Sequence, residues 1–372
     1  MKKFLLLAVV IFITSCSNDD SQPSSNKKAL AQQKLEKALS KFPGLSLSVK
    51  TASESYTLVA GDAVIKEKPM TASALHYMQS ISKTFTAVAI LKLKEEGKIN
   101  LDAKVNTYIP DICNKLPNGN IITVRQLLNM TSGLPDYLDN EHFLSDVFAG
   151  PLPMASEKVL SYVYGQPGKF APGASFGYCN INYHLLALII DSVTPNGHQT
   201  YIKDKIINAI GLSNTYYIAG SASTTAPQGT TANSLEADGT FNDVSELQFG
   251  TVLTFIGDDG IVASVQDIAG FYYKLLHDET LLSPASLKEM KVAVSYQSTP
   301  IYGLGLQFYK TRGGLQAIGH EGSGAGAGAY AFYFPSKNTS VVLCTNAGTL
   351  IDSIKEEQFL ALWEEITGLL LE

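Results

Sequence analysis

The sequence has 372 residues, of which 45% are hydrophobic and 17% are charged, and this composition is typical of a globular protein. A chain of this length buries a large core without disulfides or metal ions, and it suffices for two structural lobes. The formal net charge is −6 and no basic block occurs, which argues against a nucleic-acid-binding protein, because such proteins need clustered lysine and arginine side chains to meet phosphates.

The N-terminal segment has the pattern of a targeting signal. Two lysines precede a ten-residue apolar run over 4–13, which is too short to span a bilayer as a mature helix. Small residues then lead to Cys16, as in the lipobox of bacterial lipoproteins, although an ordinary signal peptide that contains a cysteine is the alternative. We therefore expect 1–16 to be a lipoprotein signal peptide, with Cys16 lipidated as the first residue of the mature protein. Residues 17–28 are polar and predict a flexible tether, so that the domain is anchored to a bacterial membrane, outside the cytoplasm, in the cell envelope.

The domain over 29–372 starts with a helix and two strands. Residues 29–41 predict an amphipathic helix, and a proline and a glycine stop it. Strands are predicted over 45–50 and 56–60, as the start of an antiparallel sheet. The strongest helical pattern covers 80–96, and a glycine follows it in the usual C-terminal position.

From about 100 to 240 helical periodicity dominates, and strands return from about 300. Further helices are predicted over 124–129, 182–193, 201–210 and 351–369. Further strands are predicted over 302–311, 316–320, 328–334 and 340–345, the last two joined by the turn residues Pro335-Ser336-Lys337-Asn338. We therefore predict an α+β fold, in which both ends of the chain build one antiparallel sheet flanked by helices and a mainly helical lobe is inserted between them.

Ser80 and Lys83 stand at the start of the helix over 80–96. Positions i and i+3 share a helix face, so the lysine amine points towards the serine oxygen. Serine needs a neighbouring base to act as a nucleophile, and lysine serves as that base only if burial or a second positive centre lowers its pKa. The backbone N–H of Ser80, in the first helical turn, is free to point at an anion. By itself, however, a Ser-x-x-Lys pattern also fits a capping serine followed by a solvated lysine.

Two further short motifs lie downstream, Phe176-Gly177-Tyr178-Cys179-Asn180 and Gly319-His320-Glu321-Gly322-Ser323. Alone, the first also fits a loop aromatic with a capping asparagine, and the second also fits a strand-end histidine bonded to backbone. The glycine-rich run after His320 lacks a following helix, a Walker lysine and a Rossmann acid, so it predicts no phosphate-binding loop. No second histidine completes a zinc-protease motif. We expect neither a cofactor nor a metal ion.

In this order, Ser80-x-x-Lys83, Tyr178-x-Asn180 and His320-x-Gly322 resemble the serine β-lactamase and penicillin-binding-protein family, in particular its class C β-lactamase and D-alanyl-D-alanine carboxypeptidase/esterase branch. The resemblance covers about residues 30–370 and includes SISKTFTAVAILKLKEEGKINLDAKVNTYIP, ITVRQLLNMTSGLPDY, APGASFGYCNINYHLLALIID, GIVASVQDIAGF and YGLGLQF. It implies a β-lactamase/transpeptidase-like fold and a serine hydrolase that forms an acyl-enzyme with an amide or an ester.

The resemblance also implies the roles of the first two motifs. Ser80 is the expected nucleophile, and Lys83 and Tyr178 are expected to form its proton-relay pair, with Tyr178 deprotonated or sharing its proton with the lysine. An unperturbed tyrosine has a pKa of about 10, so adjacent cations, Lys83 and His320, are expected to make Tyr178 a base near neutrality. Asn180 is expected to hydrogen-bond Lys83 or the substrate amide.

For the third motif, the resemblance implies a binding role. The backbone N–H groups of Ser80 and Ser323 are expected to form the oxyanion hole. Gly322 is expected to lack a side chain because the substrate lies against its strand.

This motif departs from the family's pattern at two positions. His320 stands where classical β-lactamases and many peptidases carry a lysine that helps to bind a substrate carboxylate, and a neutral imidazole recognises an anion more weakly. Glu321 replaces a threonine that contacts the same carboxylate, and its negative charge would repel that group unless the side chain points away. We therefore expect uncharged esters or amides to be preferred over free-carboxylate substrates such as penicillins.

The leading expectation is a lipid-anchored serine hydrolase that acts on a cell-envelope peptide, in the manner of a D-alanyl-D-alanine carboxypeptidase, or on an ester. A true β-lactamase and a catalytically weak protein that binds peptidoglycan peptides are the alternatives. The expected partners are this substrate and the membrane lipid, with no nucleic acid, and protein partners stay open. Cys113, Cys179 and Cys344 allow at most one disulfide, and Cys179 is expected to be a small buried filler.

Overall fold

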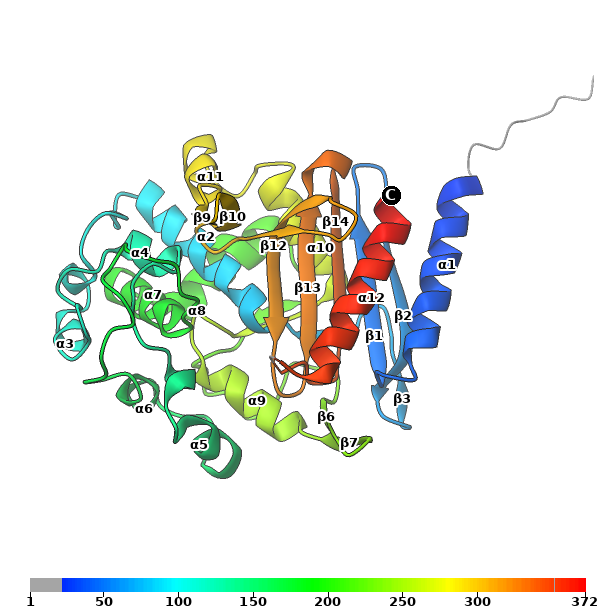
Figure 1. Ribbon diagram of the computed structural model, residues 1–372, viewed down its shortest axis with the longest axis horizontal. Coiled ribbons are helices and arrows are strands. Elements are labelled where there is room, and N and C mark those ends of the chain that lie inside the picture. Colours follow the sequence, from blue (N-terminus) through cyan, green and yellow to red (C-terminus); the bar gives the residue numbers. More distant parts are fainter. Residues whose placement is uncertain (1–21, 351) are drawn as a thin grey trace, which may run out of the picture.

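The computed structural model describes residues 22–350 and 352–372. Cys16, the predicted signal peptide and the first part of the predicted tether lie outside the described residues. A nine-stranded antiparallel sheet runs through the described part of the chain, in the order β3-β2-β1-β14-β13-β12-β11-β10-β9 (Figure 1). The β1 strand pairs with β14, so both ends of the chain build one sheet, and the predicted α+β fold is confirmed.

The nine strands are β1 (Gly44–Lys50), β2 (Ser55–Val64), β3 (Lys68–Pro69), β9 (Val294–Tyr296), β10 (Thr299–Tyr302), β11 (Gln307–Lys310), β12 (Gln316–Ser323), β13 (Gly328–Phe334) and β14 (Thr339–Thr345). The central strands β1, β13 and β14 are buried almost throughout, because helices cover both faces of the sheet. The predicted turn between β13 and β14 is confirmed, with Asn338 in the left-handed conformation that asparagine tolerates.

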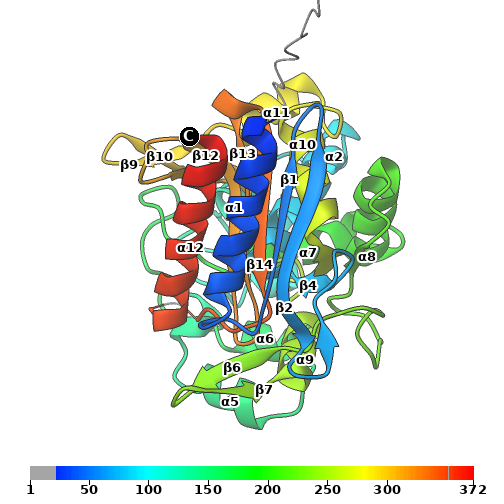
Figure 2. The same ribbon diagram turned by 90° about the vertical axis from the view of Figure 1, so that its right-hand side faces the viewer.

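Two helices from opposite ends of the chain cover one face of this sheet. They are α1 (Gln22–Ala38) and α12 (Ile354–Leu371), and they lie side by side (Figure 2). Phe359 and Trp363 of α12 pack against Tyr330 of β13, whose ring stacks on the Trp363 indole at 5.3 Å between centroids. A separate hydrophobic core fills the space between these helices and the sheet.

The α1 helix begins earlier than the sequence predicts, because residues 22–28 of the predicted tether are helical. Ala31 and Leu35 are buried against the sheet and fix the central turns of the helix. Adding further turns to a fixed helix costs little, so the polar residues before them continue it. The Lys28 ammonium also pairs with Glu54 in the turn between β1 and β2.

The opposite face of the sheet carries α10 (Val265–Leu276), which contacts β1, β13 and β14. Beyond it lies the mainly helical lobe (Figure 1), whose core surrounds α2 (Ser82–Glu95) and α7 (Ile181–Val193). The α2 helix is buried over most of its length, which explains its largely apolar sequence on more than one face.

The remaining helices are α3 (Pro110–Cys113), α4 (Val124–Leu128), α5 (Phe143–Ala149), α6 (Ser156–Ser161), α8 (Gly197–Ile202), α9 (Ser245–Thr254) and α11 (Pro284–Met290). Two small sheets are built from β4 (Leu75–Tyr77), β8 (Ile261–Ser264) and β5 (Thr215–Tyr217), and from β6 (Ser234–Ala237) and β7 (Thr240–Asp243). The predicted helix over 201–210 continues α8 as short π and 3-10 turns. Within the described residues, no helix combines the length and the apolar character needed to cross a membrane.

The strand predicted over 302–311 is wrong in its middle, because β10 ends and β11 begins on either side of a bend. Gly305 has a φ of +74°, and a Cβ atom there would clash with the Cβ atom of Ala87 in α2. The carbonyl oxygen of Gly305 accepts a hydrogen bond from Thr84 Oγ1 at 2.8 Å. The chain therefore leaves the sheet at this glycine to pack on the helix that follows Ser80.

Candidate active site

Ser80 lies in a short 3-10 turn over Gln79–Ile81, directly before α2, rather than inside the predicted regular helix. Gln79 has a φ of +50°, in the left-handed region that residues with a side chain rarely adopt. Such backbone strain persists only where surrounding packing enforces it, and it is frequent at functional sites. The turn therefore presents Ser80 at a sharp change of chain direction.

Strand β12 packs directly on this turn. A Cβ atom on Gly322 would clash with the carbonyl oxygen of Met78, and one on Gly324 would clash with the side-chain amide of Gln79. The packing of the strand on the turn therefore requires glycine at position 322. This reason differs from the predicted one, which was contact with the substrate.

Lys83 is fully buried, and each of its three possible N–H donors has an acceptor. Its Nζ lies 2.8 Å from Ser80 Oγ, 2.9 Å from Asn180 Oδ1 and 3.2 Å from the carbonyl oxygen of Asp258. Burial lowers the pKa of the Lys83 amine, and nearby carboxylates act in the opposite direction. When neutral, the amine donates two of these hydrogen bonds and accepts the third from the Ser80 hydroxyl, which is the arrangement of a general base.

Three buried aspartates surround this lysine. Asp136 accepts a hydrogen bond from the backbone N–H of Asn180, and so fixes the residue that holds the Lys83 amine. Asp258 Oδ2 accepts from the Tyr137 hydroxyl at 2.5 Å, whereas its Oδ1 has no partner among the described residues. Burial raises the pKa of Asp258 to about 7 and that of Asp259 to about 6. These carboxyl groups therefore change charge close to neutral pH.

Motif patterns alone do not identify these aspartates. Asp136 lies within SGLPDY, and the pair Asp258-Asp259 directly precedes GIVAS, so each sits in or beside a stretch that carries the family resemblance. The signal that points to the pair is its place in the otherwise apolar run TFIGDDGIVAS. Two adjacent acids in such a run are buried, and buried carboxylates need specific partners.

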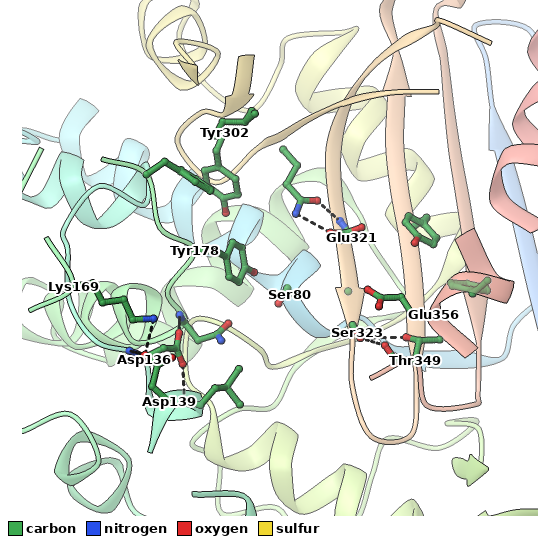
Figure 3. A pocket seen from close by; sticks show the side chains of 18 residues that line it. Ser80, Asp136, Asp139, Lys169, Tyr178, Tyr302, Glu321, Ser323, Thr349 and Glu356 are labelled. Carbon is green, nitrogen blue, oxygen red and sulfur yellow. Dashed lines mark hydrogen bonds and ion pairs between the residues drawn. The ribbon is translucent and has the colours of Figure 1, made fainter. Parts of the chain in front are cut away.

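Tyr178 faces Ser80 across the cavity (Figure 3), and its ring centroid lies 5.1 Å from Lys83 Nζ. Burial raises the pKa of the Tyr178 phenol well above its usual value, and the approach of the Ser80 hydroxyl offsets only part of this effect. This direction favours the neutral phenol, and the expectation that Tyr178 is deprotonated or shares its proton with Lys83 stays a prediction. A neutral phenol can donate its proton to a group in the cavity.

His320 is fully buried and does not line the cavity. Its Nδ1–H donates to the carbonyl oxygen of Glu321 at 2.6 Å, so Nε2 accepts from the Tyr302 hydroxyl at 3.0 Å. Burial, together with the charge of Lys83, lowers the pKa of His320 to about 3. The prediction that His320 contacts substrate or supplies a cation to Tyr178 is therefore wrong. It is a neutral residue that orients Tyr302, which does line the cavity.

A cavity of about 560 Å³ opens above Ser80 (Figure 3). Five of the seven predicted site residues line it, namely Ser80, Tyr178, Asn180, Gly322 and Ser323. Lys83 is buried next to Ser80, and only His320 points elsewhere. At one end of the cavity Lys169 and Asp139 form an ion pair at 2.6 Å.

The Ser323 hydroxyl donates to the carbonyl oxygen of Thr349, and Ser323 lines the cavity. The predicted oxyanion hole, formed by the backbone N–H groups of Ser80 and Ser323, stays a prediction. Cys113, Cys179 and Cys344 are all free and buried, and burial raises the pKa of the Cys179 thiol well above its usual value. A buried neutral thiol suits the predicted filler. No group of residues in the described part of the chain is arranged to hold a metal ion.

Comparison with known proteins identifies the family. The family model described as Beta-lactamase matches residues 32–361. Because this match spans most of the chain, the protein belongs to the β-lactamase family, whose solved relatives include hydrolases. The resemblance inferred from the three motifs is therefore confirmed.

Individual relatives are similar over different shares of their length. A D-stereospecific amidohydrolase from Streptomyces sp. superposes with a TM-score of 0.75 at 26% identity, over 86% of this chain and 94% of that chain. The octameric penicillin-binding protein homologue from Pyrococcus abyssi superposes with a TM-score of 0.75 at 25% identity, over 92% of this chain and 77% of that chain. Protein flp of Staphylococcus aureus (strain MW2) is 32% identical over 157 residues, which are 42% of this chain and 30% of that protein. The chain thus matches less than a third of the length of this curated relative.

Proposed function

We propose that this protein is a serine hydrolase that cleaves an amide or an ester through an acyl-enzyme at Ser80. The observation that carries the proposal is the distance of 2.8 Å between Ser80 Oγ and the buried Lys83 Nζ, at the wall of a cavity. The substrate class that fits the family is a cell-envelope peptide of the kind cut by D-alanyl-D-alanine carboxypeptidases, or an ester. The likeness to a D-stereospecific amidohydrolase supports amide cleavage.

The proposed reaction begins when Ser80 Oγ attacks the substrate carbonyl and its proton passes to the neutral amine of Lys83. The negative charge on the carbonyl oxygen is stabilised by the backbone N–H groups of Ser80 and Ser323. Tyr178 gives its phenolic proton to the leaving group and regains a proton from the Lys83 ammonium. The net result is that the Ser80 proton reaches the leaving group while the acyl group stays on Ser80. Water then attacks the ester by the reverse of these steps.

Two other functions are compatible with the same fold. A true β-lactamase would need to accept the carboxylate of its substrate beside Glu321, which lines the cavity. Hydrolysis of nitrocefin with a kcat/KM of about 10⁶ M⁻¹s⁻¹, near the middle of the enzyme range, would favour that alternative. A peptide-binding protein without turnover has no need of a buried lysine held against a serine hydroxyl, so we favour an enzyme.

The proposal is tested with a fluorophosphonate probe and a labelled penicillin, followed by peptide mapping. We expect at least one probe to label Ser80, and we expect Ser80→Ala to lose both labelling and hydrolysis of p-nitrophenyl esters. The exposed Ser73→Ala serves as a matched control and should keep both. Labelling of Ser80→Ala at the wild-type level, or no labelling of the wild-type protein by either probe, would overturn the proposal.

We also propose that the enzyme acts in the cell envelope, attached through a lipid on Cys16. Support comes from the apolar run and the lipobox-like residues before Cys16.

A further inference from the structure

The end of the cavity away from Lys169 and Asp139 carries two acidic side chains that have no oppositely charged partner (Figure 3). Glu321 of β12 and Glu356 of α12 line this end (Figure 3). Tyr330, which pairs with Glu321 across the strands, and Phe359, which contacts Tyr330, line the same cavity. In Figure 3, Glu356 lies beside Ser323, with its carboxylate directed towards β12. Neither carboxylate forms an ion pair with any lysine, arginine or histidine in the described part of the chain.

Each carboxylate is held in place by one oxygen and has its other oxygen free. Glu321 Oε1 accepts from the Gln307 side-chain amide at 3.2 Å, and the Glu321 backbone N–H donates back to Gln307 at 2.9 Å. Glu356 Oε2 accepts from the backbone N–H of Asp352 at 2.7 Å. The second oxygen of each group has no hydrogen-bond partner among the described residues. Both groups are thus fixed and still able to accept from a ligand.

The Tyr330 hydroxyl is a third free acceptor in the same cavity. Tyr330 pairs with Glu321 across the two strands, so both side chains project from the same face of the sheet. The tyrosine ring is fixed between Phe359, at 5.2 Å, and Trp363, at 5.3 Å, and its side chain is only 6% exposed. Its hydroxyl nevertheless has no hydrogen-bond partner among the described residues. An unpartnered hydroxyl on a side chain that is otherwise buried and lines the cavity points to a ligand that supplies its partner.

The charges act on one another at this end of the cavity. Partial burial, and then the charge of Glu356, raises the pKa of Glu321. Burial, and then the charges of Glu321 and Glu356, raises the pKa of Tyr330 well above 10, so its hydroxyl stays neutral. Two like charges that repel each other beside an unpartnered hydroxyl are destabilising unless a cation joins them.

From this geometry we infer that the end of the cavity between β12, β13 and α12 is a subsite for a primary ammonium group of the substrate. A primary ammonium has three N–H donors, and Glu321, Glu356 and Tyr330 offer three acceptors. A calcium ion is a poorer match, because it takes about six to eight oxygen ligands. The inference rests on the proposed function, since it names the class of amide or ester that Ser80 cleaves: one that carries a free amine on its acyl part.

The test compares two pairs of p-nitroanilides that differ in one ammonium group. The first pair is D-alanine p-nitroanilide and its N-acetyl derivative, and the second pair is the p-nitroanilides of N-acetyl-D-lysine and N-acetyl-D-norleucine. For the full-length protein we expect kcat/KM to be at least about tenfold higher for the ammonium member of one pair. We expect E321Q and E356Q each to reduce that ratio about tenfold, and Y330F to reduce it less, because a neutral acceptor contributes less than a charged one.

The matched control is E357Q. Glu357 is exposed on the same first turn of α12 and does not line the cavity, so its charge has a similar effect on the helix end but not on the subsite. We expect E357Q to keep the wild-type ratio. A ratio near one for both pairs, an unchanged ratio in E321Q and E356Q, or an equal fall in E357Q would overturn the subsite.

The design separates this inference from the proposed function. If the wild-type protein hydrolyses the neutral p-nitroanilides and a fluorophosphonate labels Ser80, the proposed serine hydrolase activity is supported. This holds whether or not kcat/KM is higher for the substrates that carry an ammonium group. If it hydrolyses neither pair and neither probe labels Ser80, the proposed function fails and the subsite fails with it.

Discussion

The charge state of the Lys83 amine is the residue-scale property on which the proposed chemistry depends most. Burial favours the neutral amine that accepts the Ser80 proton, and the aspartates around it favour the ammonium form. Burial raises the pKa of Asp258, so this carboxyl group gains its negative charge at a higher pH than an exposed aspartate does. The negative charge that Asp258 gains stabilises the Lys83 ammonium and so opposes the loss of its proton.

We therefore predict that Asp258→Asn shifts the acid limb of the pH profile of kcat/KM to lower pH. Removing the carboxylate lowers the pKa of Lys83, so the lysine reaches its neutral form at a lower pH. Asparagine still offers an oxygen to the Tyr137 hydroxyl, which preserves the local hydrogen bond. The exposed Asp111→Asn is the control and should leave the profile unchanged. An acid limb that stays in place or moves to higher pH in Asp258→Asn would contradict this account.

Between elements, the contact that matters most is the packing of β12 on the 3-10 turn that carries Ser80. Gly322→Ala would place a methyl group against the carbonyl oxygen of Met78, which is backbone and cannot rotate away. We predict that kcat/KM falls about 100-fold, because a displacement of about 1 Å disrupts a reacting geometry to that extent. We also predict that the free energy of unfolding falls by about 1–3 kcal/mol.

The control for this steric argument is Gly270→Ala in α10, where a Cβ atom meets nothing within 4 Å. Alanine is favoured over glycine inside a helix, so this variant should gain up to about 1 kcal/mol and keep its activity. Urea unfolding and ester hydrolysis measure both effects. Wild-type kcat/KM in Gly322→Ala would show that the strand and the turn adjust independently.

Local sequence patterns predicted most helices and strands. The hydrophobic periods of 2 residues for a strand and 3.6 for a helix, and the turn residues between them, can be recognised within short stretches of sequence. They also predicted the approach of Lys83 to Ser80, since the spacing i to i+3 needs only one helical turn. The orientation of His320 was not predicted, because which face of β12 turns towards the core is decided by helices far along the chain. The bend at Gly305 escaped prediction for a similar reason, as its contact lies in α2.

Over the whole molecule, the position of α1 limits how far the proposed lipid anchor is from the folded domain. Five residues lie between Cys16 and Gln22, where α1 begins, and a fully extended chain over these six steps reaches about 20 Å. If Cys16 carries the anchor, the domain is held close to the membrane surface. Its substrates are then those present within this short distance of the bilayer.

We predict that Cys16→Ser abolishes metabolic labelling with palmitate and releases the protein from the membrane fraction. Stable attachment requires more than one acyl chain, so the loss of the lipidated cysteine removes the attachment as a whole. Cys113→Ser is the control, because this cysteine is buried within the domain, and it should keep the label. Palmitate labelling that persists in Cys16→Ser would refute the site.

The place of β14 in the sheet determines the order in which the molecule is completed. It lies between β1 and β13, and its partner residues on β1 were synthesised about 300 residues earlier. The hairpin of β1 and β2 is therefore released from the ribosome with one edge unpaired, and such an edge readily pairs with strands of other chains. Protection of that edge during synthesis is a requirement of this topology. The hairpin stays incomplete until the strand that is made last of the nine reaches it.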